Sequence, residues 1–186
     1  LFLLPFLSMS QSVFNKAFDN DSTNDFGQGV IQTLDGGFLL IAYSSTLLSD
    51  LVIIKTNEKG NETWRKTYNF KTGYGDDPQA VIQLIDSSYI ICGVTQDTNG
   101  TKPDIMLFKV DKNGDSLWLR RYGGIEQDYG DDVKQTADGG FIILSNSYSF
   151  SGGNNLDAYL IKTDSDGVIE WDTVYGGSGD DVTEKI

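Results

Sequence analysis

The sequence contains no histidine and only one cysteine, Cys92. The lack of histidine excludes His-based general acid–base catalysis, Ser–His and Cys–His nucleophile pairs, and zinc sites that need histidine. A single cysteine excludes an intramolecular disulfide and zinc sites built from paired cysteines. Several common catalytic and metal-binding residue sets are therefore ruled out.

Basic residues are also few, since the 186 residues hold 14 lysines and arginines against 27 aspartates and glutamates, a formal net charge of −13. Nucleic acid needs a basic surface, so we expect no nucleic-acid partner. Glutamate is scarce, with 5 against 22 aspartates, and the chain has 21 glycines but only 3 prolines. Aspartate and glycine favour turns, whereas glutamate favours helices. This composition predicts many short connections and no helical domain.

Residues 1–10 (LFLLPFLSMS) form an apolar segment that is too short to span a bilayer. Small residues of the type that a signal peptidase accepts follow the apolar run. We interpret the segment as the truncated end of a secretory signal peptide, with an N-terminal strand as the alternative. The signal-peptide interpretation places the protein outside the cytosol, secreted or at the cell surface, and the sequence predicts no membrane span.

Residues 14–186 repeat with spacings of 50, 54 and 53 residues between equivalent aromatic motifs. The first block reads FNKAF (14–18), WRKTY (64–68), WLRRY (118–122) and WDTVY (171–175). Two further blocks recur, exemplified by TADGGFIILSNSY (136–148) and DAYLIKTDSDG (157–167). The repeats span about 14–63, 64–117 and 118–170, and a fourth begins at 171–186. Together, residues 11–186 form the repeat region.

Each repeat holds four strand-like stretches separated by turn residues. In the third repeat these are residues 132–136, 141–147, 157–163 and 168–175, divided by turns such as Asp138-Gly139-Gly140. A period near 50 with four strands per unit is typical of a β-propeller blade. We therefore predict an all-β fold, a partial β-propeller of four-stranded antiparallel blades. A β-solenoid is the alternative.

The phrase WDTVYGGSGDD, with QTADGGFII and DAYLIKTDSDG, resembles the tandem β-propeller repeats of secreted bacterial and archaeal surface proteins. The resemblance covers residues 14–186, although Ser87-Ser88 replace the glycines of the first hairpin in the second repeat. A weaker similarity exists to the tryptophan-docking motif of quinoprotein propellers, because Asp164, Gly167 and Trp171 recur at equivalent spacing in the other repeats. We interpret that motif as blade packing and infer no quinone.

Two residue columns are predicted to be structural. The tryptophan column should pack between blades, where each indole buries about 200 Å². The lysine column ends an otherwise apolar third strand, so we expect each ammonium to pair with a carboxylate. Cys92 aligns with apolar residues of the other repeats and should be a small buried side chain. The columns are Trp64, Trp118 and Trp171, and Lys55, Lys109 and Lys162.

An aspartate column is the main candidate for ligand binding. Its members either form a ring of carboxylates that holds Ca²⁺ or a polyol, or cap backbone N–H groups in the loop before each first strand. We favour capping. Two turns also resemble the front half of a calcium loop but lack its downstream glutamate, which favours simple hairpin turns. The column is Asp25, Asp76, Asp128 and Asp180, and the turns contain Asp111, Asn113, Asp115, Asp164 and Asp166.

No set of catalytic groups converges in the repeat pattern, so we predict an exported, non-enzymatic repeat protein that binds a protein or glycan ligand, acts in adhesion, or serves as a spacer. We expect no metal or cofactor. The alternative is a glycan-active hydrolase or lyase that uses Asp131 and Asp132. Adjacent strand residues point to opposite faces, which weakens that pair. Three blades do not close a ring of about 4 to 8, so self-association or further blades from a longer chain are expected.

Overall fold

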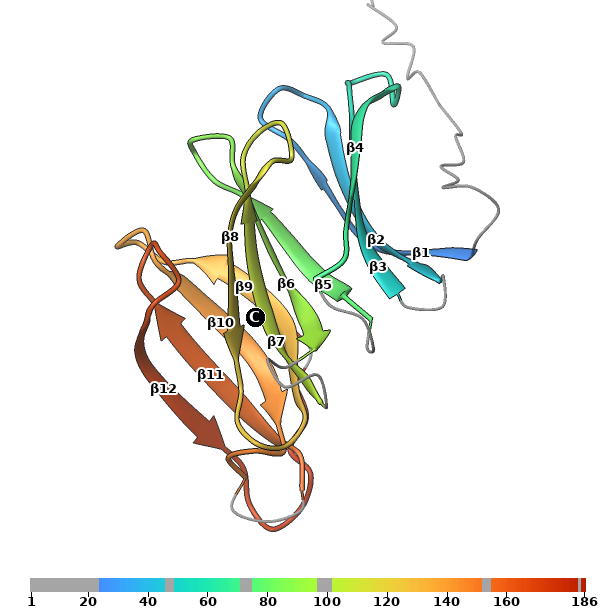
Figure 1. Cartoon of the computed structure of the whole chain (residues 1–186). Helices are drawn as coiled ribbons and strands as arrows, with labels where there is room; N and C mark the ends of the chain where they lie inside the picture. The colour runs from blue at the N-terminus through green and yellow to red at the C-terminus, as the bar shows by residue number, and fades with distance from the viewer. Residues whose placement is uncertain (1–23, 46–48, 71–74, 97–101, 152–154, 184) are drawn as a thin grey trace, which may run out of the picture.

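A computed structural model describes residues 24–45, 49–70, 75–96, 102–151, 155–183 and 185–186. These residues form twelve strands in three four-stranded antiparallel sheets, and no helix (Figure 1). Sheet 1 contains β1 (Asn24–Gln32), β2 (Phe38–Ser45), β3 (Ser49–Thr56) and β4 (Glu62–Tyr68). Sheet 2 contains β5 (Asp77–Gln83), β6 (Tyr89–Gln96), β7 (Pro103–Val110) and β8 (Ser116–Tyr122). Sheet 3 contains β9 (Asp128–Gln135), β10 (Phe141–Ser147), β11 (Asp157–Thr163) and β12 (Ile169–Tyr175).

The prediction of an all-β chain with four antiparallel strands per repeat is thus confirmed. Each sheet has strand order 1-2-3-4, so strands that follow one another in the chain are neighbours in the sheet. The sheets are offset from the repeat boundaries drawn from the tryptophan motif, since Trp171 belongs to the last strand of sheet 3. The signal-like segment 1–10 and the first motif at 14–18 lie outside the described residues. Among the described residues there is also no helix that could cross a membrane.

The first hairpin of each sheet is built on an aspartate turn. In sheet 1 the carboxylate of Asp35 accepts a hydrogen bond from the N–H of Gly37 at 3.0 Å. Sheet 2 forms the same turn without glycine, since Asp86 accepts from the N–H of Ser88 at 2.9 Å. This turn places Ser87 at a φ of 68°, in the left-handed region that favours glycine, so its backbone conformation is strained.

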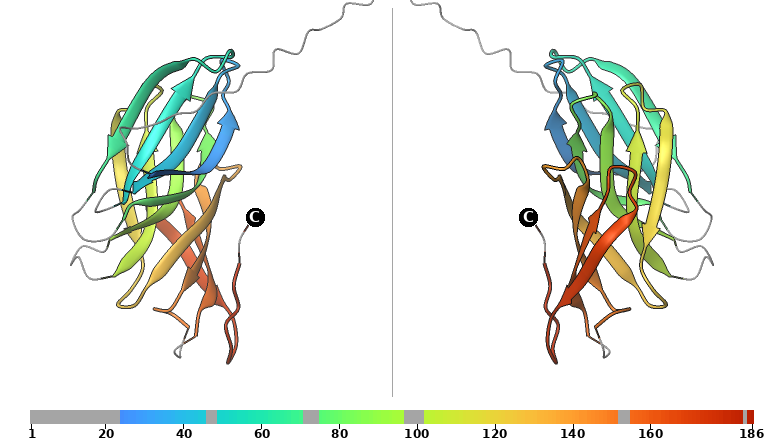
Figure 2. Two further views of the ribbon diagram at one scale, coloured as in Figure 1. Left: turned by 90° about the vertical axis from the view of Figure 1, so that its right-hand side faces the viewer. Right: turned by 90° about the vertical axis from the view of Figure 1, so that its left-hand side faces the viewer.

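The three sheets stack in chain order (Figure 2). The first strand of each sheet packs across the preceding sheet, so β5 contacts β1, β2 and β3, while β9 contacts β5, β6 and β7. Within the described residues the sheets form an open stack and not a closed ring. Each first strand also carries a β-bulge, located at Gln28, Gln79 and Asp131.

Two apolar cores lie between the sheets. One core joins the faces of sheets 1 and 2, and the other joins sheets 2 and 3. Third strands such as β7 are buried on both faces, because sheet 2 is enclosed between its two neighbours. Cys92 is fully buried in the second core, and burial raises the pKa of its thiol, as expected for a small core residue without a nucleophilic role. The cores contain Leu39, Ile41, Leu51, Ile53, Ile91 and Phe108, and Ile90, Leu107, Phe141, Ile143 and Ile161.

Candidate functional site

The tryptophan motif of one sheet packs against a hairpin turn of the next sheet. Trp64 lies so close to Gly114 that a Cβ on this glycine would be 2.8 Å from the indole. The hydroxyl of Tyr68 donates a hydrogen bond to the carbonyl oxygen of Gly114. Trp64 and Tyr68 are four residues apart on β4 and therefore share one face of the sheet. We call this pair, with the glycine that it holds, the aromatic clasp.

Sheets 2 and 3 are joined by a second aromatic clasp. A Cβ on Gly167 would be 3.3 Å from the indole of Trp118, and the hydroxyl of Tyr122 donates to the carbonyl oxygen of Gly167 at 2.7 Å. The guanidinium of Arg120 lies 5.2 Å from the centre of the Trp118 ring, on the same strand. Tyr122 is 6% exposed, and burial raises the pKa of its phenol. Both Trp64 and Trp118 thus pack between sheets.

The turn glycines have two reasons to be glycine. Gly114 has a φ of 80° and Gly167 a φ of 75°, which other residues adopt at a cost. Neighbouring side chains also crowd both positions, since a Cβ would lie 2.8 Å from Trp64 at Gly114 and 2.9 Å from Arg120 at Gly167. The recurring tryptophans were predicted to pack between repeats, but no role was predicted for the tyrosines. A tyrosine nevertheless follows each tryptophan by four residues, and this spacing is the signal in the sequence.

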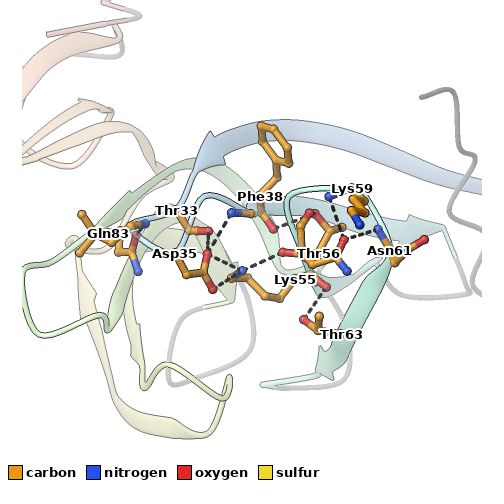
Figure 3. A network of polar contacts seen from close by, with 12 residues as sticks. Thr33, Asp35, Phe38, Lys55, Thr56, Lys59, Asn61, Thr63 and Gln83 are labelled. Atoms are coloured by element: carbon orange, nitrogen blue, oxygen red, sulfur yellow. Dashed lines mark hydrogen bonds and ion pairs between the residues drawn. The ribbon is translucent and has the colours of Figure 1, made fainter. Parts of the chain in front are cut away.

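The lysine column fulfils its expected role in two of the three sheets. The ammonium of Lys55 binds both carboxylate oxygens of Asp35, at 3.0 and 2.9 Å, and the carbonyl oxygen of Thr56 at 2.8 Å (Figure 3). In sheet 3, Lys162 pairs with Asp138 at 2.8 Å and with Glu170 at 2.6 Å. Hydrogen bonds from Thr33 and Lys55 lower the pKa of Asp35 to about 2.

Sheet 2 departs from this pattern. Among the described residues, Lys109 forms no ion pair, and the carboxylate of Asp86 binds the backbone N–H and the hydroxyl of Ser88 instead. In sheet 1, a Cβ on Gly37 would lie 2.1 Å from the carbonyl oxygen of Thr56 and 2.7 Å from the Lys55 ammonium, so Ser88 cannot occupy the position that Gly37 has. The hydrogen bond from Ser88 and, to a smaller extent, the charge of Lys109 lower the pKa of Asp86, so Lys109 is attracted to a carboxylate in sheet 2 without a direct ion pair.

The aspartate column caps loops where the structure shows its contacts. Asp76 accepts hydrogen bonds from the N–H of Phe70 at 2.8 Å and the hydroxyl of Thr95 at 2.6 Å. Asp128 accepts from the N–H of Gly124 at 2.8 Å, and from the hydroxyls of two serines of the β10 strand and the loop after it. Asp128 is fully buried, and burial raises the pKa of Asp76. Both carboxylates lie inside the fold, bound to the loop before the first strand.

The column shifts by one residue after sheet 3. The N–H of Gly177 donates to Asp181 at 2.8 Å, as that of Gly124 does to Asp128. Asp180, the residue expected from spacing, instead accepts a hydrogen bond from the N–H of Leu156 at 2.8 Å. Asp25 sits at the start of β1.

The two calcium-like loops are tight hairpin turns. Asp111 accepts from the backbone N–H of Asn113 and of Asp115, both at 2.8 Å, and these bonds lower the pKa of Asp111. Asp115 pairs with Lys66 of sheet 1 at 3.0 Å. The turn of sheet 3 repeats the pattern, with Asp164 accepting from the N–H of Asp166 at 2.9 Å. Across the part of the chain that the structure describes, no three carboxylates gather as a metal site.

The Asp131–Asp132 pair lies at a β-bulge, so the strand alternation expected from sequence fails there. Leu144 pairs with Asp132, and the next residue of β10 pairs with Gly130, which leaves Asp131 as the extra residue. The carboxylate of Asp131 accepts from the side-chain amide of Asn146, and Asp132 accepts from the N–H of Ile186 at 3.0 Å. Both carboxylates thus lie beside the C-terminal segment.

A cleft of about 680 Å³ opens between the turn ends of sheets 1 and 2. Its walls carry the aromatic rings of Trp64 and Tyr89, together with lysine, amide and carboxylate side chains of the surrounding turns and strand ends. A few polar groups around aromatic surface are typical of ligand sites. The sequence alone did not reveal this cleft, because its residues come from four separate segments. Its polar lining includes Lys59, Gln83, Lys112 and Asn113.

No family model matches the chain, and no curated protein matches it. Among solved structures, the chain is similar to a protein of unknown function from Bacteroides caccae. The identity is 12% and the TM-score is 0.43, over 81% of this chain and 68% of that chain. The function proposed below therefore rests on the geometry of this chain.

Proposed function

We propose that the protein is an exported, non-enzymatic binding or adhesion scaffold built as part of a β-propeller. The aromatic clasp supports this architecture most directly. It recurs between sheets 1 and 2 and between sheets 2 and 3 with equivalent residues, so each sheet docks on the next in one repeated geometry. The contacts of each first strand with the preceding sheet agree with blades arranged around an axis. The signal-like residues 1–10 support export.

The cleft between sheets 1 and 2 is the proposed ligand site. Trp64 offers a half-buried aromatic surface, and the exposed side chains of Lys59 and Lys112 stand at its rim. Such a lining suits a glycan, whose apolar faces stack on aromatic rings and whose hydroxyls and acidic groups bind polar side chains. The carboxylates of Asp76 and Asp128 accept hydrogen bonds from loop backbone, so they serve the fold, which supports binding over catalysis as the function of the protein.

Screening an oligosaccharide library by thermal shift and then by calorimetry tests this proposal. We expect at least one neutral or acidic oligosaccharide to bind, and the double variant Lys59→Ala/Lys112→Ala to weaken binding about tenfold, the effect of losing about 1.4 kcal/mol. Lys134→Ala is the matched control, since Lys134 is exposed on β9 outside the cleft. Equal loss in both variants, or no binding in the library, contradicts the glycan site.

A glycan-active hydrolase or lyase is the second candidate, because the β-bulge exempts Asp131 from the regular alternation of β9. The experiment is an assay for reducing ends released from the same oligosaccharides. Turnover by the native chain that is lost in Asp132→Asn favours the enzyme. Persistent binding without turnover favours the scaffold.

A further inference from the structure

Sheet 3 carries the Trp–Tyr pair of an aromatic clasp, but no glycine turn of the described residues lies against it. Trp171 is 47% exposed and Tyr175 is 60% exposed, whereas the equivalent Tyr122 of sheet 2 is 6% exposed. Trp171 and Tyr175 lie four residues apart on β12, in the same arrangement as Trp118 and Tyr122 on β8. In both earlier sheets this pair closes over a glycine turn of the following sheet.

The face of sheet 3 beside this clasp repeats a face that is buried elsewhere. Ile90 and Leu107 of sheet 2 are fully buried against sheet 3. Their equivalents in sheet 3, Ile142 and Leu160, remain partly exposed. Strand register shows that Ile90 and Ile142 are equivalent, since Ile90 pairs with a lysine of β7 and Ile142 pairs with a lysine of β11. The open face thus has the apolar pattern of an inter-sheet contact.

Residues 176–183 cover part of this face. The hydrogen bond from Gly177 to Asp181 matches that from Gly124 to Asp128, the residue where the first strand of sheet 3 begins. The N–H of Thr183 donates to the side chain of Asn146 on β10 at 2.9 Å. Between this segment and β11–β12 remains a hollow of about 670 Å³, lined by Ala158, Tyr175 and residues of the segment itself.

We propose that the open face of sheet 3 docks a fourth four-stranded sheet of the same repeat, with Asp181 at the start of its first strand. Trp171 and Tyr175 would close over a glycine turn between its third and fourth strands. The occupant is a sheet continuous with this chain, because residues 176–183 already lie where a separate sheet would have to place its own first strand. The inference rests on the proposed propeller arrangement and not on the ligand site.

Extending the chain tests this inference. Asp181 is equivalent to Asp128, so Ile186 is equivalent to Val133, and a second copy of residues 134–175 placed after Ile186 completes a fourth sheet. The appended copy carries Trp171→Phe, so the chain keeps its 3 tryptophans. We expect Tm to rise by roughly 5 °C or more. The fraction of the total tryptophan emission that acrylamide can quench should fall by about one third, since Trp171 is one of 3 tryptophans.

Tyr175→Phe provides the matched control. It should lower Tm in the extended chain, where the hydroxyl gains a glycine carbonyl, and leave the 186-residue chain unchanged. An appended copy that stays protease-sensitive, with Trp171 still quenched as before, overturns the inference. A stable dimer of the 186-residue chain at low salt, with Trp171 buried, overturns it too, because a second copy is then the occupant. Tyr122→Phe separates the two proposals, since its lower Tm reports the internal clasp even when the extension fails to dock.

Discussion

The first hairpin turn of each sheet has the same backbone conformation, but one residue of that turn differs between the sheets. Ser87 holds a φ of 68°, where the first hairpins of sheets 1 and 3 have glycine. The left-handed conformation costs a residue with a side chain roughly 1–2 kcal/mol, while glycine adds entropy to the unfolded chain. We expect Ser87→Gly to stabilise the protein by about 0.5–1 kcal/mol in urea unfolding. Gly36→Ser, the matched control at φ 82°, should destabilise it by a similar amount, and a gain in both variants contradicts the strain.

The Lys55–Asp35 pair makes stability depend on pH at the acid end. Hydrogen bonds from Thr33 and Lys55 lower the pKa of Asp35 to about 2, against 3.8 without them. A lowered folded-state pKa means that the stabilisation is present above pH 3.8 and is lost as the pH falls towards 2. The side chain of Asp35 is 66% exposed, so solvent screening limits the effect to about 1 kcal/mol or less.

Asp35→Asn is the variant that isolates this contribution. The difference in unfolding free energy between parent and variant should be constant above pH 5 and shrink as the pH falls below 4. Asp50→Asn serves as a control, since Asp50 forms none of the ion pairs of the described residues. A difference that persists unchanged to pH 2 is incompatible with the assigned pKa.

At the scale of elements, the buried aspartates hold the loops that deliver each first strand. The fully buried carboxylate of Asp128 binds one backbone N–H and two serine hydroxyls, one of which is also fully buried. We expect Asp128→Ala to destabilise the protein by roughly 2–3 kcal/mol, because these partners lose their acceptor inside the fold. Asp180→Ala, which changes an exposed residue, should cost less than about 1 kcal/mol.

Calcium titration by calorimetry completes that experiment. We expect no calcium binding tighter than about 10 µM, because sensor-grade sites need several converging oxygen ligands. If calcium binds more tightly, and Asp128→Asn removes the binding without unfolding the protein, the carboxylate is a metal ligand and not a loop cap.

The strands that the sequence predicted best are those enclosed by turns on both sides. Residues 141–147 and 157–163 match β10 and β11 in full. A turn with Asp and Gly precedes the first apolar run and another follows the second, so these boundaries are marked in the sequence. The first strand was expected at 132–136 and spans Asp128–Gln135 instead. The bulge at Asp131 breaks the period of two, so a pattern search loses the strand at that residue. The same spacing argument chose Asp180, although the loop contact falls on Asp181.

Contacts between sheets were only partly predictable. The recurring tryptophan indicated packing between repeats, but sequence could not show that its partner is a glycine turn about 50 residues further on. Sheet 2 has Ser88 where sheets 1 and 3 have glycine, and only the structure shows that the Ser88 hydroxyl binds Asp86 in this turn. Local patterns therefore predicted the elements, and the relations between elements required the three-dimensional structure.

At the scale of the whole molecule, the open face of sheet 3 should govern how the 186-residue chain behaves in solution. Trp171 and Tyr175 expose large aromatic surfaces beside the partly exposed Ile142 and Leu160. A contiguous apolar patch of this kind binds hydrophobic dyes, and the net charge of −13 opposes association at low salt. We therefore expect dye fluorescence at low ionic strength, and growing self-association in sedimentation as salt screens the charge.

The double variant Trp171→Ser/Tyr175→Ser tests whether the dye binds to the open face of sheet 3. It should reduce the dye signal and the salt-induced association while leaving Tm within about 2 °C of the parent, because both side chains are largely exposed. Ile85→Ser is the matched control, since Ile85 is 90% exposed on a hairpin turn of sheet 2, away from the open face. If Ile85→Ser lowers the dye signal as much, exposure alone and not the sheet face explains the binding. If the double variant also unfolds the protein, the clasp already supports sheet 3 without a fourth sheet.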